Sequence, residues 1–453
     1  MKNIKTIYTV FAAMLLLTAC DNDLEQSPEL DLEASKLVEF EPVLNAAYYY
    51  QTGVAMPQLV MGDFRADNML MLENPHTSID TYDSDLGGGD MAGAFFSPVY
   101  SNLYKAILSA NNVIENSLDD TQINEAKFLR GLSYFKLVMI FGDVSVILTP
   151  QPSVSEIPDV DLTRQPVADV YNNVIIPDLQ DAIAGLTNSG LATGRASQIA
   201  AKAFLGKVYM YRGDFANAAT MLAEVLSDAV VEGVTLEPNF ADVVSDVSSE
   251  IIFATQLSSS IPNADGTSSS STFVGWFAGN DTKSLTPLDP RLTAAFDASS
   301  AAGGGTDLRK SLTIDAAGGK GVKYTGGNSD QDFIEMRLSD VILMYAEALN
   351  ESTNATGAKS ATILAGLDAI RTRAGLTSLV GTATTQADVD TAIQKERRVE
   401  LALEGHRWFD LVRTGTVDAE MGGQTISSNY YVFPIPSTEI TATNGIITQN
   451  TGY

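Results

Sequence analysis

The chain has 453 residues, more than the roughly 100–200 of one ordinary domain, so it needs several domains or one large, repeat-built architecture. Its 45% hydrophobic and 19% charged residues are typical of a soluble globular protein with a sizeable core. The formal net charge of −28 repels nucleic acids and anionic lipid headgroups, which excludes both as main partners.

The first twenty residues, MKNIKTIYTVFAAMLLLTAC, have the features of a secretory signal. Two lysines form its positive start, and the apolar stretch Ile7–Leu17 is too short to span a bilayer comfortably. Its ending resembles the bacterial lipobox, whose cysteine is lipidated and becomes the mature N-terminus. Cys20 is the only cysteine in the chain. We therefore expect residues 1–19 to be removed, Cys20 to carry lipid, and no disulfide to hold the fold.

Residues 20–34 are acidic and rich in turn-forming residues, which indicates a tether. Acidic residues just after the lipidated cysteine resemble the surface-export signal of Bacteroidetes lipoproteins. In enterobacteria, Asp21 at this position would instead mean retention in the inner membrane. Several acyl chains on one N-terminus anchor a protein without a basic patch. The remaining residues, 35–453, are expected to form one domain.

Helical periodicity dominates residues 35–254. Apolar side chains recur at three- and four-residue steps in residues 101–118 and 124–141, which is the spacing of one buried helical face. The second stretch is expected to end at Gly142-Asp143. In residues 166–186, Pro177 predicts a boundary or a kink.

Residues 195–226 contain Leu205-Gly206-x-x-Tyr209, the core of a tetratricopeptide repeat. Gly213-Asp214-Phe215 supplies the turn, and small residues at 206 and 218 let the paired helices approach. Alanine-rich helical hairpins imitate this motif. The pattern predicts a scaffold of tetratricopeptide-like helical pairs.

Residues 255–330 break this pattern. They are rich in serine and glycine with only short apolar runs, and they are predicted to form long loops with a few strands. Loops of this length in a compact domain are usually functional or disordered. Helices are predicted to resume in residues 337–352, 360–376 and 395–415.

The last of these stretches, KERRVELALEGHRWFDLVRTG, places one of the chain's two histidines among acids and arginines. A glycosidase needs two carboxyl groups about 5–9.5 Å apart, one of them with a raised pKa. Arginines three residues away along a helix would lower the carboxyl pKa, which is the wrong direction for a general acid. The expected pairs are Glu400 with Arg397, Glu404 with Arg407, and Asp410 with Arg407 and Arg413.

Other catalytic and metal-binding motifs are weak. His406 has no G-x-S-x-G motif to supply a nucleophile, and two histidines without H-E-x-x-H make a zinc site improbable. Residues 316–321, AAGGKG, lack the first glycine and the final Ser/Thr of a P-loop. The calcium-like run that starts at Asp83 has Gly87 at position five and Ala94 at position twelve, where a calcium loop carries glutamate. We expect neither a cofactor nor a metal.

A structural role fits residues 395–415 better. Leu401, Trp408 and Leu411 fall on one helical face, and Gly405 permits close approach of a neighbouring helix. The charges would flank that face as ion pairs, and His406 would donate a hydrogen bond to a carbonyl or an acid.

ERRVELALEGHRWFDLVRTG also looks like the C-terminal signature of the SusD/RagB family, outer-membrane nutrient-capture lipoproteins of Bacteroidetes. The tryptophan often found before the helix of Tyr100 is replaced by the Phe95-Phe96 region. The chain closes on a segment similar to the family's usual ending, so the resemblance covers essentially the whole mature chain. Other family-like segments occur in the expected order at 125–144, 194–214, 250–256, 289–291 and 337–351.

The resemblance implies a mainly α, SusD-like fold. A tetratricopeptide-like scaffold (35–254) would pack against a loop-rich, partly β ligand region (255–330), followed by C-terminal helices (331–453). It implies a lipid-anchored protein that faces the cell exterior and sits as a lid on a TonB-dependent transporter barrel. Such proteins bind an oligosaccharide or polysaccharide without cleaving it. Peptide capture, as in RagB-like members, a hydrolase, and a pure assembly factor remain alternatives.

Sugars bind to aromatic faces and to side chains that satisfy their hydroxyls. Because Trp408 belongs to the packing motif, Trp276 in the Ser-rich loop, beside Phe277, is the best free platform; alternatively it plugs the loop onto the scaffold. An ion pair between Arg65 and Asp67 is the structural alternative in the N-terminal segment. The acidic surface favours a neutral glycan. The candidate ligand contacts in residues 62–90 are Arg65, Asp67, Asn68 and Tyr82.

Overall fold

The computed structural model describes residues 39–72, 74–150, 160–266, 287–324, 330–353 and 358–453. Contacts between residues divide the chain into two units, Met1–Phe40 and Glu41–Tyr453. Every element described below belongs to the second unit.

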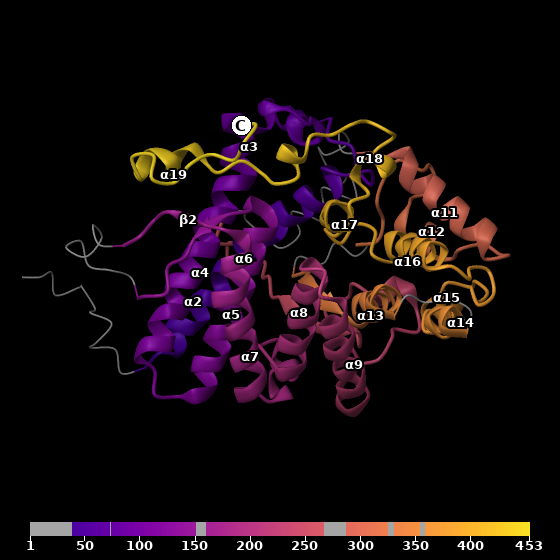
Figure 1. The fold of residues 1–453 in the computed structure, drawn as a ribbon, viewed down its shortest axis with the longest axis horizontal. Helices are drawn as coiled ribbons and strands as arrows, with labels where there is room; N and C mark the ends of the chain where they lie inside the picture. The colour runs from indigo at the N-terminus through magenta and orange to yellow at the C-terminus, as the bar shows by residue number, and fades with distance from the viewer. Residues whose placement is uncertain (1–38, 73, 151–159, 267–286, 325–329, 354–357) are drawn as a thin grey trace, which may run out of the picture. The chain divides into compact units, whose positions relative to one another are not determined.

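The long helices form a row in which each helix packs against the next (Figure 1). The connections from α4 to α5 and from α8 to α9 are short, so the helices of each of these pairs are antiparallel, as in tetratricopeptide-like arrays. The predicted mainly helical scaffold is therefore confirmed. The row consists of α2 (Glu41–Leu59), α4 (Ser97–Asn116), α5 (Asp120–Phe141), α7 (Ile176–Gly185), α8 (Gln198–Tyr211), α9 (Phe215–Glu232), α13 (Leu338–Thr353) and α16 (Gln386–Glu400).

The α8–α9 pair forms as its repeat motif predicts. The side chain of Asp214 accepts a hydrogen bond from the Asn217 N–H and caps α9. Gly206 lies on α8 where a Cβ would be 2.6 Å from Leu222 Cδ2 on α9, so the absence of a side chain makes room for Leu222 between the two helices. The motif therefore encodes the distance between the helices.

Capping signals place the ends of the neighbouring helices. The side chain of Asp119 accepts hydrogen bonds from two backbone N–H groups of the first turn of α5, and Gly142 ends that helix with a positive φ of 74°. Before Pro177, the short helix α6 (Val167–Val170) continues into the π-helical turn η8 (Tyr171–Ile175) and then into α7. The predicted boundary at Pro177 is thus a local π-helical turn, not a break.

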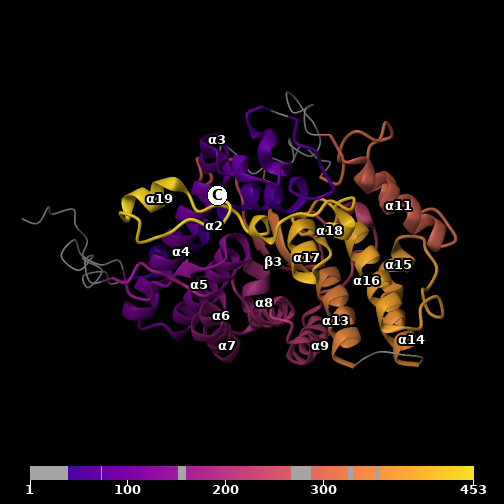
Figure 2. The ribbon, with the colours of Figure 1, turned by 45° about the horizontal axis from the view of Figure 1, so that its top comes forward.

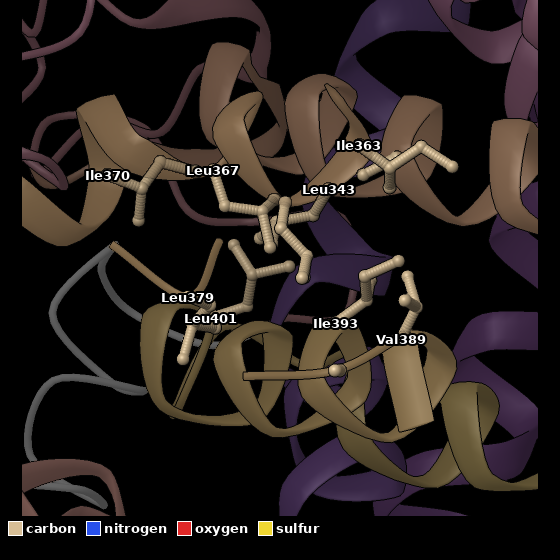
Figure 3. Close-up of a cluster of buried hydrophobic side chains, with 11 residues drawn as sticks. Leu343, Ile363, Leu367, Ile370, Leu379, Val389, Ile393 and Leu401 are labelled. Atoms are coloured by element: carbon tan, nitrogen blue, oxygen red, sulfur yellow. The ribbon is translucent and has the colours of Figure 1, made fainter. Parts of the chain in front are cut away.

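The C-terminal helices share a core of aliphatic side chains (Figure 3). The helices α14 (Ala358–Ala365) and α15 (Asp368–Arg373) lie beside α13 and α16 in Figure 2. In Figure 3 the labelled side chains of this core point toward one another across the space between these helices. The core includes Leu343, Ile363, Leu364, Leu367, Ile370, Leu379, Val389, Ile393 and Leu401.

Residues 395–415 do not form the single helix that was expected. The helix α16 ends at Glu400, and α17 (Arg407–Thr414) starts after a turn in which Leu403 and Gly405 have positive φ angles of 65° and 81°. A contact with a distant segment holds this turn, because the N–H of Gly405 donates a 2.6 Å hydrogen bond to Asp63 Oδ2. Gly405 does permit the predicted close approach, and the neighbour is the π-helical turn η3 (Val60–Phe64).

Residues 255–330 contain more helix than expected. The helices α11 (Pro290–Ala302) and α12 (Arg309–Thr313) lie in this region. Only Leu292 and Phe296 of α11 are buried, so one apolar pair on an Ala- and Ser-rich helix gave no periodic signal. In the described part of this region the expected strands are reduced to Thr255 at the end of β3 (Ile251–Thr255) and to isolated bridges at Leu288 and between Ile314 and Gly321.

Two antiparallel strand pairs occur in the described part of the chain. β1 (Val144–Ser145) pairs with β2 (Arg164–Gln165), and β3 (Ile251–Thr255) pairs with β4 (Phe333–Arg337). The second pair ties the two sides of the loop-rich region to the scaffold.

Short helices complete the described structure, and no helix in it combines the length and apolarity needed to cross a bilayer. The short α-helices are α3 (Gly89–Met91), α18 (Val417–Glu420) and α19 (Ser437–Ala442). The remaining turns are η4 (His76–Asp80), η5 (Ser84–Gly87), η6 (Ala92–Phe96), η9 (Asn188–Thr193), η10 (Phe240–Asp242) and η11 (Ser428–Tyr430).

Candidate functional site

The acids of the C-terminal signature lie in a buried, charge-balanced network that we name the central cluster. It joins α12, β4, α15, α16 and the turn after α16. Among the described residues, every salt bridge of its members is made to another member. The central cluster contains five acids and five bases: Glu250, Asp307, Glu396, Glu400 and Glu404 with Arg309, Lys323, Arg337, Arg371 and Arg373.

Glu404 is held at the centre of this network. Arg337 donates from Nε to Glu404 Oε2 and from Nη2 to Glu404 Oε1, both at 2.8 Å, and Lys323 Nζ lies 2.5 Å from Oε1. Burial would raise the pKa of Glu404, but the two neighbouring cations lower it to about 2. Burial acts on Glu400 in the same way, and three surrounding arginines hold its pKa well below the ordinary value. These carboxylates stay ionised and cannot act as general acids near neutral pH.

Asp410 belongs to a second balanced network, which we name the α13 cluster. Its members are Asp340, Glu347 and Asp410 with Lys207, Arg397 and Arg413. Burial opposes ionisation of Asp410, but Arg397 and Arg413 lower its pKa to about 2. Asp410 with Arg413 is the expected pair that the structure contains.

The other expected pairs are wrong. Glu400 pairs with Arg309, Arg337 and Arg373, and Glu404 pairs with Lys323 and Arg337. The break after Glu400 removes the helical spacing of Glu404 and Arg407 only. Arg397 lies on the same helix as Glu400, and Arg407 on that of Asp410, but both arginines pair with acids elsewhere. Partners distant in sequence replace the local ones, while the predicted direction of the pKa shifts is correct.

His406 does not resemble a catalytic base. Burial, with a contribution from Lys207, lowers the pKa of its imidazole to about 4, so the ring is neutral at pH 7. The neighbouring hollow has a volume of about 20 Å³, enough for a water molecule but not for a substrate. The expected hydrogen bond from His406 to a carbonyl or an acid is not found among the described residues.

Arg65 and Tyr82, two predicted ligand contacts, lie together against Trp408. Arg65 is completely buried and donates hydrogen bonds to the carbonyls of Ile79, at 2.7 Å, and Tyr430, at 3.1 Å. Its guanidinium carbon lies 4.4 Å from the ring centroid of Tyr82, and that ring stacks on Trp408 at 5.7 Å. Tyr82 is partly exposed, so it can meet a ligand, whereas Arg65 supports the surface from beneath.

Asp67 and Asn68 also face inward. Asp67 forms salt bridges with Arg407 and Arg398, each at 2.7 Å, and these arginines share Glu420 as a second partner. We name these four residues the Asp67 cluster. Asn68 donates a 2.7 Å hydrogen bond to Asp63. Asp67 therefore pairs with the C-terminal signature, in place of the suggested surface ion pair with Arg65.

Three tyrosines that the sequence did not single out lie near Arg65 and Trp408, the two residues that contact the Tyr82 ring. Tyr430, Tyr431 and Tyr453 are each partly exposed. Tyr430 packs edge-on against Tyr453 at 5.4 Å, and Tyr431 packs edge-on against Trp408 at 6.3 Å. We name Tyr82 and these three residues the tyrosine face. A signal was available in the sequence, because NYYVFP and the final Tyr453 are clusters of aromatics outside any helical period.

Trp276 and Phe277 lie outside the described residues, as does Cys20. The two ends of the loop that carries Trp276 are nevertheless placed. At its start, the backbone N of Asp265 lies beside Gly53 of α2. At its end, the N–H of Leu70 donates a 2.8 Å hydrogen bond to the carbonyl of Pro287. Pro287, the first described residue after Trp276, therefore lies beside the segment that carries Arg65 and Tyr82.

A further hollow lacks the aromatic ring expected of a sugar site. It has a volume of about 770 Å³ and is lined by α11, α16 and α17. No aromatic side chain is among its described lining, and its charged groups include members of the three clusters. Nor does the described part of the chain hold three or more His, Cys, Asp or Glu residues arranged around a metal position.

Comparisons with known proteins match both halves of the chain. The family model described as SusD family matches residues 299–430, and the model described as starch-binding associating with outer membrane matches residues 24–210. A solved laminarin binding SusD-like protein is 27% identical, with a TM-score of 0.71, and the match covers 92% of this chain and 99% of that one. The chain belongs to the SusD/RagB family.

Other SusD/RagB relatives match over similar lengths. SusD-like protein P2 of Formosa agariphila is 24% identical, and the match covers 100% of both chains. A SusD superfamily protein of Parabacteroides distasonis has the same fold, with 23% identity, a TM-score of 0.74, and coverage of 91% of this chain and 98% of that one. SusD/RagB proteins are non-catalytic binding proteins, in agreement with the ionised state of the signature acids.

Proposed function

We propose that this chain binds an oligosaccharide or a polysaccharide at the cell surface, without cleaving it, and delivers it to a TonB-dependent outer-membrane transporter. The observation that carries this proposal is the match to the laminarin binding SusD-like protein over nearly the full length of both chains. The ionised, buried acids of the central cluster support it, because they remove the carboxyl pair that cleavage would need.

The proposed ligand surface combines the tyrosine face with the loop that carries Trp276 and Phe277. Tyr82 offers a partly exposed ring, and Arg65 fixes that ring from below. The anchoring of Pro287 beside Leu70 supports a position for the loop near this ring. Aromatic faces at one surface suit the apolar faces of sugar rings.

The membrane anchor is proposed to be the lipid on Cys20, with the protein facing the cell exterior as a lid on the transporter barrel. One matching family model is described as associating with the outer membrane, which supports this location. Replacing Cys20 with serine should release the protein from the outer-membrane fraction into the soluble fraction. A Cys20→Ser protein that stays membrane-bound after a high-salt wash would contradict the lipid anchor.

Calorimetry against a panel of glycans tests the ligand proposal. We expect laminarin or another neutral glucan to bind and uronic-acid or sulfated polymers to bind weakly, because the surface of the chain is acidic. Trp276→Ala should lower the affinity about tenfold, consistent with the loss of one stacking platform. Binding of peptides with no binding of any glycan would overturn the proposal in favour of peptide capture.

A further inference from the structure

A cavity of about 210 Å³ lies on the helical scaffold. α2 forms one wall, β3 and the residues that follow it form the opposite wall, and the turn before α8 closes one end. Arg65 lies sixteen positions after Tyr49 along α2 and η3, which corresponds to about 24 Å at 1.5 Å per residue. The cavity is therefore separate from the tyrosine face.

The mouth of the cavity carries an exposed aromatic ring. Tyr49 is 39% exposed, and its hydroxyl donates a 3.0 Å hydrogen bond to the carbonyl of Pro262, which holds the ring against the opposite wall. Ile261, at 58% exposed, lies on that opposite wall. A fixed ring with apolar surface beside it can pack against the C–H face of a sugar.

Two side-chain amides at the same cavity retain hydrogen-bonding capacity. Among the described residues, no side-chain hydrogen bond of Gln256 is found, and its amide lies over Gly194, where a Cβ would be 2.3 Å from Gln256 Nε2. Asn45 accepts a hydrogen bond from Arg195, at 2.9 Å, which leaves its amide N–H groups available. An amide offers both donors and an acceptor, which matches a sugar hydroxyl.

The floor of the cavity is rigid. Gln51 donates a 2.8 Å hydrogen bond to Ser133, and Thr255 donates a 2.8 Å hydrogen bond to Glu335. Both floor residues are buried, so their side chains are fixed before a ligand arrives. Such pre-organisation lowers the entropy lost on binding.

The charge around the cavity disfavours an anion. Arg195 forms salt bridges with both Glu41 and Glu125, each at 2.8 Å, so one cation faces two carboxylates. The guanidinium also lies 4.9 Å from the ring centroid of Tyr48, which keeps it against the wall. The excess negative charge favours a neutral ligand over a uronate or a sulfate.

We propose that this cavity binds one ring of a neutral sugar as a second carbohydrate site on the scaffold. The volume is below the roughly 300–1,000 Å³ of pockets for drug-sized ligands, so it suits a single ring. Tyr49 packs on the face of the ring, and Gln256 and Asn45 contact its hydroxyls. The inference rests on the proposed function, since a sugar held here is a terminal or branch unit of the captured glycan.

Fluorine NMR of the purified chain labelled with 3-fluorotyrosine tests this site. The resonances of Tyr49 and Tyr50 are assigned from the variants Tyr49→Phe and Tyr50→Phe. We expect glucose, galactose or mannose to shift the Tyr49 resonance saturably at millimolar concentration. Tyr50 is on the same helix but does not line the cavity, so its resonance should move much less. Gln256→Ala should weaken the hexose affinity at least threefold.

The outcomes separate this site from the proposed function. If laminarin binds and Trp276→Ala weakens it, but no hexose shifts the Tyr49 resonance, the cavity is not a sugar site and the proposed function stands. A hexose shift that persists unchanged in Gln256→Ala, or a saturable shift with glycyl-glycine in place of a hexose, would also overturn the site. A hexose shift with no glycan affinity in calorimetry would support the cavity and contradict glycan capture.

Discussion

Glu404 remains ionised although water does not reach it. Its two oxygens together receive two hydrogen bonds from Arg337 and one from Lys323. A buried charge is tolerated when opposite charges and hydrogen bonds replace its hydration, and removal of one partner leaves the others uncompensated. The signature is therefore a matched set of residues and not a group of independent charges.

The first prediction is that Glu404→Gln destabilises the fold by about 3–5 kcal/mol, because it leaves Arg337 and Lys323 with one carboxylate too few. Urea unfolding followed by circular dichroism measures this change. The control is Asp181→Asn, which breaks an exposed salt bridge with Lys127 and should cost less than about 1 kcal/mol. Equal effects of the two variants would contradict the importance of the central cluster.

The second prediction is that the fold loses stability at low pH. Glu404 and Asp410 have folded pKa values of about 2, below the unfolded values of about 4.3 and 3.9. As the pH falls from about 5 to 2, the unfolded chain takes up protons first, so the free energy of unfolding decreases. Each group should contribute about 2 kcal/mol to this loss.

Urea midpoints at pH 5, 4 and 3 measure the acid effect. Glu404→Gln removes one of the carboxyl groups with a lowered pKa, so its midpoint should fall less between pH 5 and pH 3 than that of the unaltered chain. A midpoint that stays constant down to pH 3 would show that these carboxylates are not stabilised by their cations.

At the scale of elements, the turn between α16 and α17 depends on a segment more than 300 residues earlier. Gly62 of η3 lies against the backbone of Gly405, and a Cβ at position 62 would be 2.1 Å from the Gly405 carbonyl oxygen. Asp63 then accepts the hydrogen bond from the Gly405 N–H. The break in the helix and the docking of η3 are one structural feature.

The third prediction is that Gly62→Ala destabilises the fold by about 3 kcal/mol, because the added methyl group would contact backbone atoms that cannot rotate away. Gly93→Ala is the matched control: Gly93 also lies in a π-helical turn, η6, and a Cβ there meets no atom within 4 Å. Thermal unfolding of the two variants compares them. If Gly62→Ala unfolds at the temperature of the Gly93→Ala control, the two segments do not pack as described.

Local signals predicted most elements but not the contacts between them. The end of α5 at Gly142 and the repeat motif around Gly206, with its turn at Asp214, are encoded locally and were predicted correctly. The break after Glu400 could not be read, because Asp63 and Gly62 lie far away in sequence. The helix α11 was missed because two buried side chains give no period.

At the scale of the whole molecule, α2 and η3 connect the two proposed sugar-binding places. Tyr49 lies at the cavity and Arg65 lies beneath the tyrosine face, about 24 Å further along the helical segment. A single glycan that reaches both places would bind more tightly than a sugar at either place alone, because its second contact is intramolecular.

The fourth prediction is that affinity rises in two steps along a ladder of laminarin oligosaccharides. Short oligomers should depend on the tyrosine face and the Trp276 loop alone, and oligomers long enough to span about 24 Å should bind roughly tenfold more tightly. Tyr49→Ala should abolish the second step only, whereas Tyr50→Ala should preserve both. Calorimetry across the ladder measures this, and a smooth rise that Tyr49→Ala leaves unchanged would contradict a ligand that spans both places.

The candidate site was only partly predictable from residue types. Arg65, Asp67 and Asn68 have suitable polar groups for a sugar, but burial and internal partners occupy them. The burial of a side chain depends on the whole fold, so it cannot be predicted from a short stretch of sequence. Tyr430 and Tyr453 are 23 residues apart at the chain's end and meet only after folding.

The three clusters cancel their own charge, with ten acids against ten bases, so the net −28 of the chain comes entirely from residues outside these clusters. An approaching polymer then meets the full field of that excess, which salt screens within about 8 Å at physiological ionic strength. Sulfated or uronic polymers would be repelled over a longer distance at the low ionic strength of fresh water than at the high ionic strength of seawater. The arrangement of charges inside the protein thereby sets which polymers can come near its outside.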